Sequence, residues 1–333
     1  MSTSNQAALT PAEHPVTAPS YRVGAGILSS MSAGAFWGLI FVIPLLLPQA
    51  NAWQLSAARY LVYGGVALLL ILPRWRQVFG RLGRAEWQAL LGLSLLGNIV
   101  YYVLLVWGVQ WAGAAPTALI IGLIPVVSTL MGLRSHKTVS LTAMLAPLCL
   151  CVLGTALVAM HSLTHGSAAT ESTNTWQRAL GLLAAAGALL TWSTYSIWNS
   201  QWLMRRRDIS PWDWSLLTGL VTGALAILLA IPAFGVPWWT AASDFSDQNW
   251  LRFWVITGTL AILASVVGNA FWNHASRLLP LTMIGQMIVF ETIFALVYGF
   301  LYEWRWPGVQ EWLAMTALIA GVLWCARLHQ KAH

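Results

Sequence analysis

The chain is a series of apolar stretches, each long enough to cross a membrane, separated by short polar loops. A helix needs about 20 apolar residues to span a bilayer, and in lipid only helices and closed barrels satisfy their backbone polar groups. Ten stretches fit this length: 24–46, 53–72, 86–109, 113–133, 139–160, 178–203, 212–233, 251–275, 281–302 and 307–327. We therefore predict an all-α membrane protein with ten transmembrane helices.

The composition agrees with this class. Hydrophobic residues make up 58% of the chain and charged residues 8%, whereas soluble domains carry about 25% charged residues. The three cysteines lie in apolar stretches, and no metal-binding, P-loop or dinucleotide fingerprint is present. We expect no disulfide, no metal and no cofactor.

The basic residues predict the orientation. With the N-terminus inside, the cytoplasmic segments hold 13 of the 17 Lys and Arg residues, and the outer segments hold three. Both termini are thus expected in the cytoplasm, with the chain in the cytoplasmic (inner) membrane. The same bias explains the net charge of +7, so we do not expect nucleic-acid binding.

The two halves of the chain repeat a motif. "SLLGNIVYY" (94–102) and "SVVGNAFWN" (265–273) share Ser, Gly and Asn in register. Because each half holds an odd number of spans, the second half must enter the membrane from the opposite side. Such inverted repeats are the plan of many secondary transporters, whose substrate site lies near the midplane between the halves. We expect two inverted five-helix repeats around a central cavity.

The boundaries follow from this division of the chain. The predicted segments are a disordered cytoplasmic tail (1–23), a first five-helix repeat (24–160), an extracytoplasmic linker (161–177), a second five-helix repeat (178–327) and a cytoplasmic tail (328–333).

Polar and aromatic residues recur on single helix faces in the third, sixth and eighth spans. Polar groups that face lipid lack partners, so these faces should turn inward. A cavity of rings and amides suits a flat amphipathic ligand, although such stripes also hold helices together by hydrogen bonds. The candidate cavity residues are Trp37, Asn98, Tyr101, Tyr102, Trp192, Tyr195, Asn199, Asn269, Trp272, Asn273 and Glu291.

The ten spans, the two halves and a Trp early in the first and sixth spans resemble the drug/metabolite transporter superfamily of the EamA type, over residues 24–327. "TWSTYSIWNSQW" (191–202) and "AFWNHA" (270–275) are most similar to YddG-type aromatic amino-acid exporters. The resemblance implies export of aromatic amino acids by alternating access. One departure is that the family usually has Pro inside both the fourth and ninth spans. Pro125 is present, but the ninth span has Glu291–Thr292 there.

Pro125 is a candidate hinge for alternating access. Proline deletes a backbone donor and kinks a helix, and the kink is either a hinge or static.

Glu291 lies ten residues into a span that starts at Leu281, about 15 Å deep and so near the middle of the core. Arg59 is the one basic residue placed deep in a predicted span, at a similar depth. Three roles for Glu291 are open: a buried ion pair with Arg59, a cavity carboxylate that binds the substrate's ammonium or carries a proton, or a protonated group that packs helices.

We expect a secondary transporter, not an enzyme, that exports a small-molecule substrate and works as a monomer in the lipid bilayer. Aromatic amino acids are the leading substrates, and other amino acids, nucleobase-like metabolites or drugs are the alternative. A membrane-embedded lipid or isoprenoid enzyme would need clustered titratable residues, whereas here they are scattered. Without an ATP-binding domain, uphill transport must draw on a gradient.

Overall fold

The computed structural model describes residues 22–127, 173–236, 247–279 and 284–331, with short pieces between 145 and 160. The helices of these ranges are α1 (Val23–Gly38), α2 (Ile43–Leu46), α3 (Ala52–Ile71), α4 (Trp75–Phe79), α5 (Arg84–Ser94), α6 (Val100–Ala112), α7 (Ala114–Ile121), α10 (Thr175–Arg205), α11 (Pro211–Gly235), α13 (Asp247–Leu260), α14 (Asn269–Leu278), α16 (Val289–Tyr302) and α17 (Val309–Lys331). Two π-helical segments, Leu95–Ile99 and Ala261–Gly268, join α5 to α6 and α13 to α14.

Six helical runs within the described ranges are long and apolar enough to cross a membrane. They are Val23–Leu46, Ala52–Phe79, Arg84–Ala112, Thr175–Arg205, Pro211–Gly235 and Asn249–Leu278, and they match the first three spans of each predicted half. The fourth and ninth spans contain the shorter apolar helices Ala114–Val127 and Val289–Tyr302, and α17 covers the tenth. Most of the fifth span, of the tail 1–23 and of the linker 161–177 lie outside the described residues.

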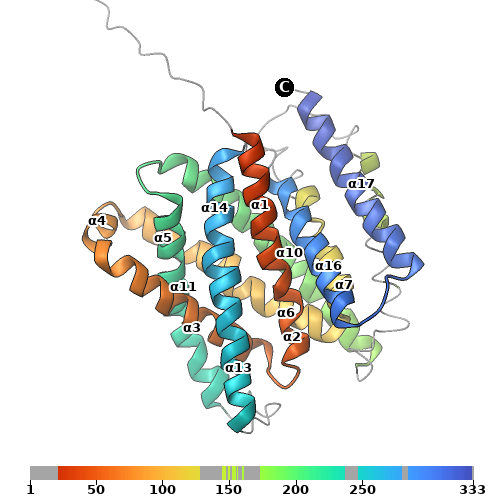
Figure 1. Cartoon of the computed structure of the whole chain (residues 1–333), viewed down its shortest axis with the longest axis horizontal. Coiled ribbons are helices and arrows are strands. Elements are labelled where there is room, and N and C mark those ends of the chain that lie inside the picture. Colours follow the sequence, from red (N-terminus) through yellow and green to blue (C-terminus); the bar gives the residue numbers. More distant parts are fainter. Residues whose placement is uncertain are drawn as a thin grey trace, which may run out of the picture.

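The helices stand side by side in a bundle, and α1 begins at the same end of it as α17 finishes (Figure 1). α3 packs along α11, α10 along α6, and α1 along α14 and α16. Small residues allow the close approaches. A Cβ added at Gly64 would lie 2.4 Å from the Cα of Gly223, and one at Gly34 would lie 2.8 Å from the backbone nitrogen of Glu291.

Two of the helices begin with the same four-residue pattern. Asn51 precedes α3 in "NAWQ", and Asn174 precedes α10 in "NTWQ". In both, the Asn side chain accepts a hydrogen bond from the backbone of the Gln three residues later, whose side chain bonds back to the Asn backbone. This capping box satisfies the free donors of the first turn and fixes where each helix begins.

The two copies of the repeated motif adopt the same unusual backbone. Both Gly97 and Gly268 lie in π-helical segments, in the third and eighth spans. A π-helical turn inserts a residue into the helix and rotates the side chains that follow it. The repeat seen in the sequence is thus also a repeat of local structure.

The fourth span is interrupted beside Pro125. α7 ends at Ile121, a turn follows at Gly122–Leu123, and helix resumes at Ile124. Proline cannot bond to the carbonyl four residues before it and clashes with it, which accounts for a break at Ile121. The break is consistent with the predicted kink, and a hinge motion at Pro125 stays a prediction.

Candidate functional site

Three tryptophans from three helices meet in the interior. The ring of Trp37 on α1 lies 5.6 Å from that of Trp192 on α10 and 5.2 Å from that of Trp272 on α14. Trp192 and Trp272 are 5.3 Å apart. All three are buried, and the distances are those of favourable aromatic pairs.

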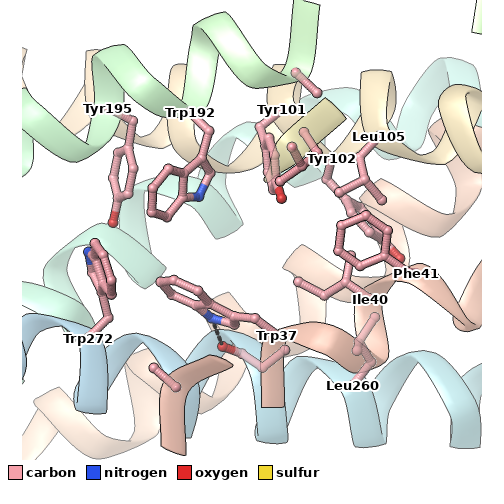
Figure 2. Close-up of a cluster of buried hydrophobic side chains, with 14 of the residues drawn as sticks. Trp37, Ile40, Phe41, Tyr101, Tyr102, Leu105, Trp192, Tyr195, Leu260 and Trp272 are labelled. Carbon is pink, nitrogen blue, oxygen red and sulfur yellow. Dashed lines mark hydrogen bonds between the residues drawn. The ribbon is translucent and has the colours of Figure 1, made fainter. Parts of the chain in front are cut away.

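Two tyrosines extend this group. Tyr101 on α6 and Tyr195 on α10 lie 6.4 Å and 5.8 Å from the ring of Trp192. Figure 2 shows Tyr195, Trp192 and Tyr101 facing Trp272 and Trp37 across the interior. We call Trp37, Tyr101, Trp192, Tyr195 and Trp272 the ring cluster. The structure thus brings together five of the predicted cavity residues, from both halves of the chain.

The π-helical segments contact and position two rings of the cluster. The indole nitrogen of Trp37 donates to the carbonyl of Ala264, 2.9 Å away, inside the second of these segments (Figure 2). A Cβ at Gly268 would lie 2.7 Å from that indole nitrogen, and one at Gly97 would lie 2.3 Å from the ring of Tyr195. The motif glycines therefore make room for a ring from the other half. Sequence reasoning missed this role, although their shared position in the two copies was a usable signal.

The predicted asparagines take a different part. Asn199 donates to Asn273 at 3.0 Å and accepts from the indole of Trp214 at 2.9 Å. Asn98 donates to Thr222 at 3.1 Å, and Asn269 to Tyr63 at 3.4 Å. These bonds join helices. In this structure the amides thus hold helices together, which was one of the two predicted roles, since a buried amide must find partners. A place for them in a cavity wall stays a prediction.

Arg59 on α3 is buried beside the ring cluster. Its Nε donates to Ser265 at 2.9 Å, and its guanidinium carbon lies 4.4 Å and 5.0 Å from the ring centres of Tyr102 and Tyr60. Aromatic faces stabilise a cation at such distances. Its Nη1 has no hydrogen-bond partner. Tyr102 thus faces the cation, while Tyr101 faces the tryptophans.

Glu291 on α16 is also buried, at 1% exposure. Its Oε1 accepts from the Tyr101 hydroxyl at 3.3 Å, and its Oε2 has no partner. The ion pairs that join described residues do not include one between Glu291 and Arg59. The direct ion pair, one of the three open roles, is therefore not formed here, and the guanidinium contacts Ser265 and the rings of Tyr60 and Tyr102 instead.

A separate cavity lies at the side of the bundle. It measures about 550 Å³ between α16 and α17 and is lined by apolar side chains such as Leu296, Phe300 and Ile319. No residue of the ring cluster borders it, so it is not the candidate site. Among the described residues, no group of three or more His, Cys, Asp or Glu is placed to hold a metal ion.

Comparison with known proteins shows what this bundle is. Residues 24–160 match the model of the EamA-like transporter family. The chain is also 34% identical to the inner membrane protein YtfF of Escherichia coli (strain K12), over 91% of this chain and 95% of that protein. The chain belongs to the EamA-like transporter family. It is therefore a membrane transporter of the drug/metabolite type and not an enzyme.

One solved structure supports the fold of this EamA-like chain. It is a crystal structure of a protein 17% identical, with a TM-score of 0.63, matched over 92% of this chain and 98% of the other. At that identity the likeness concerns the fold alone.

Proposed function

We propose that this transporter exports aromatic amino acids by alternating access, across the inner membrane in which YtfF is found. The observation that carries the proposal is the ring cluster, which is flanked by a buried guanidinium and a buried carboxylate that each keep an unpartnered polar atom. Aromatic side chains stack on rings, and an amino acid carries one group of each charge.

The rings pack against one another in this structure. Trp37, Trp192 and Trp272 are all less than 5% exposed. The proposed cycle opens the cluster to one side at a time, so that a substrate ring replaces part of this contact. Arg59 then faces the substrate carboxylate with its free Nη1, and Glu291 faces the ammonium.

We further propose ten helices in two inverted repeats, 24–160 and 178–327. Three features support this arrangement. The third and eighth spans share the Ser-Gly-Asn motif, whose Gly lies in a π-helical segment in both copies. α10 packs on α6 as α1 packs on α14, and α3 meets α11 at Gly64 and Gly223. Pairs related in this way are expected of a two-fold axis in the membrane plane.

The test is counterflow in proteoliposomes. Vesicles that hold the purified protein are loaded with unlabelled phenylalanine, tryptophan or tyrosine and diluted into a trace of the labelled compound. We expect transient accumulation of label, which vesicles without protein do not show. Competition by other amino acids, nucleobases and cationic drugs ranks the substrate class. If nucleobases or drugs compete with the labelled compound and aromatic amino acids do not, the proposed substrate class is wrong.

The orientation, with both termini in the cytoplasm, is tested separately. In a background without Cys149, Cys151 and Cys325, a cysteine replaces Ser167 or Gln77. The first is expected to react with an impermeant thiol reagent on intact cells, and the second only after lysis. The reverse pattern would invert the orientation.

A further inference from the structure

Glu291 has too few partners for an ionised carboxylate. It is 1% exposed, and the Tyr101 hydroxyl at 3.3 Å is the one hydrogen-bond donor that it contacts in the described structure. A buried carboxylate is normally held by several donors or by a cation. Tyr101 is neutral, and its bond is longer than most hydroxyl–carboxylate bonds.

The charged groups around Glu291 do not replace those donors. α16 packs against α1, α7 and the short helical turn Leu39–Phe41, and none of these carries a titratable side chain. Tyr101 faces Glu291 from α6, and Arg59 from α3 contributes a positive charge that acts through space. Arg59 itself is held by Ser265 and the ring of Tyr102, without a salt bridge to Glu291.

The neutral acid fits this site better than the ion. An unpaired buried charge loses its entire hydration, whereas a neutral carboxyl with one unmade hydrogen bond loses far less. The unpartnered Oε2 is then the atom that carries the proton, and Oε1 accepts from Tyr101.

We propose that Glu291 holds a proton in the conformation seen here and exchanges it for the ammonium group of the substrate, which makes the transporter a proton antiporter. This inference rests on the proposed function. When substrate binds, the carboxyl O–H bond breaks, the proton leaves to water on the side that is open, and the carboxylate pairs with the ammonium. When substrate leaves on the other side, a proton from that side restores the acid. One proton enters for each ammonium exported.

The first test measures coupling. Proteoliposomes are made acidic inside and diluted into alkaline buffer that contains labelled aromatic amino acid. We expect the wild type to accumulate label above the equilibrium level until an ionophore removes the pH gradient. Glu291→Gln should lose this accumulation, because an amide neither releases a proton nor pairs with an ammonium. Glu291→Asp should retain part of it. Glu303→Gln, at the far end of α16, is the matched control and should behave as the wild type.

The second test does not depend on transport or on a variant that folds. A hydrophobic carbodiimide reacts with protonated carboxyls in apolar surroundings, and peptide mass spectrometry locates the adduct. We expect labelling at Glu291 in wild-type membranes, declining as the pH is raised and blocked by added substrate. If the wild type shows no counterflow of aromatic amino acids, the proposed function itself is wrong. Counterflow that no pH gradient drives, or Glu291 unlabelled at every pH, would overturn the proton proposal alone.

Discussion

Two arginines of this chain have opposite surroundings. Arg206 follows α10 at one end of the bundle, where it bonds to Asp208 through Nε and Nη2, pairs with Glu86, and donates to the Arg81 carbonyl at 2.7 Å. Arg59, inside the bundle, has a single hydrogen bond and two ring contacts. At the end of the bundle Arg206 thus has two carboxylate partners, whereas Arg59 in the interior has no carboxylate partner among the described residues.

The difference indicates a structural role for Arg206 and a functional role for Arg59. The Arg206 network (Arg81, Glu86, Arg206, Asp208 and Arg277) joins the loop before α5 to the ends of α10 and α14, and so links the two halves of the chain. Both of its carboxylates pair with Arg206, while Arg81 and Arg277 donate to backbone carbonyls, as expected of a group that fastens helix ends. Arg59 and Glu291 cost stability where they lie, which is typical of ionisable residues that serve a transport path.

The largest effect is expected at Arg59. Arg59→Met should reduce counterflow by more than about tenfold, because loss of a buried charge that meets a ligand charge costs about 2–5 kcal/mol. The unfolding temperature in detergent should change little, since the loss of one hydrogen bond and two ring contacts is offset by removal of an underpaired buried charge. Ser265→Ala, which removes only that bond, is the graded control. Transport at the wild-type rate by Arg59→Met would contradict a role of Arg59 in transport.

The next effect is expected in the ring cluster. Trp192→Ala should lower counterflow about fivefold to tenfold at equal protein level, because each aromatic contact is worth about 1 kcal/mol. Trp192→Phe should recover most of it. Trp176→Ala is a control on the same helix, since that side chain is 69% exposed at the start of α10. Similar losses at the two positions would show that the cluster only supports packing.

A smaller effect, on stability, is expected at the Arg206 network. Arg206→Gln should lower the free energy of unfolding by about 1–2 kcal/mol, because its partners are charged but partly exposed. Thermal unfolding in detergent measures this loss, and Glu86→Gln in the Arg206→Gln background should add little. Full additivity of the two changes would show that they do not act as one network.

The smallest effect is expected at Asp208, whose side chain is 52% exposed. The hydrogen bond from Arg206 lowers the pKa of Asp208 to about 2. A carboxyl with a lowered pKa stabilises the fold above its unfolded pKa of about 4, and this contribution is lost as the pH falls towards 2. Asp208→Asn should thus lower the unfolding temperature slightly at neutral pH and not at all at the acidic end of this window. An equal shift at both ends would contradict the assignment.

The sequence alone determined the class of protein and most of its spans. Apolar stretches of membrane length predict helices because lipid offers the backbone no other partner, and six of the predicted spans are confirmed as helices of sufficient length and hydropathy. Helical spacing also brought forward four residues of the ring cluster, and the Trp early in the first and sixth spans brought forward Trp37. These inferences depend on local periodicity and on the solvent, which a single sequence displays.

Only the tertiary structure decided which polar residues meet. The asparagines and the rings share helix faces, yet the asparagines bond across helices and the rings face one another. Which neighbour each side chain meets depends on the helices packed against that face. Depth along the helices placed Arg59 near Glu291, but the guanidinium contacts Ser265 and Tyr102, and the Glu291 carboxyl accepts a hydrogen bond from Tyr101. Helical spacing gives the height of a residue and the face it occupies. The distance between two charges depends on how helices from separate parts of the chain are packed and rotated, and that is set by contacts such as Gly64 with Gly223.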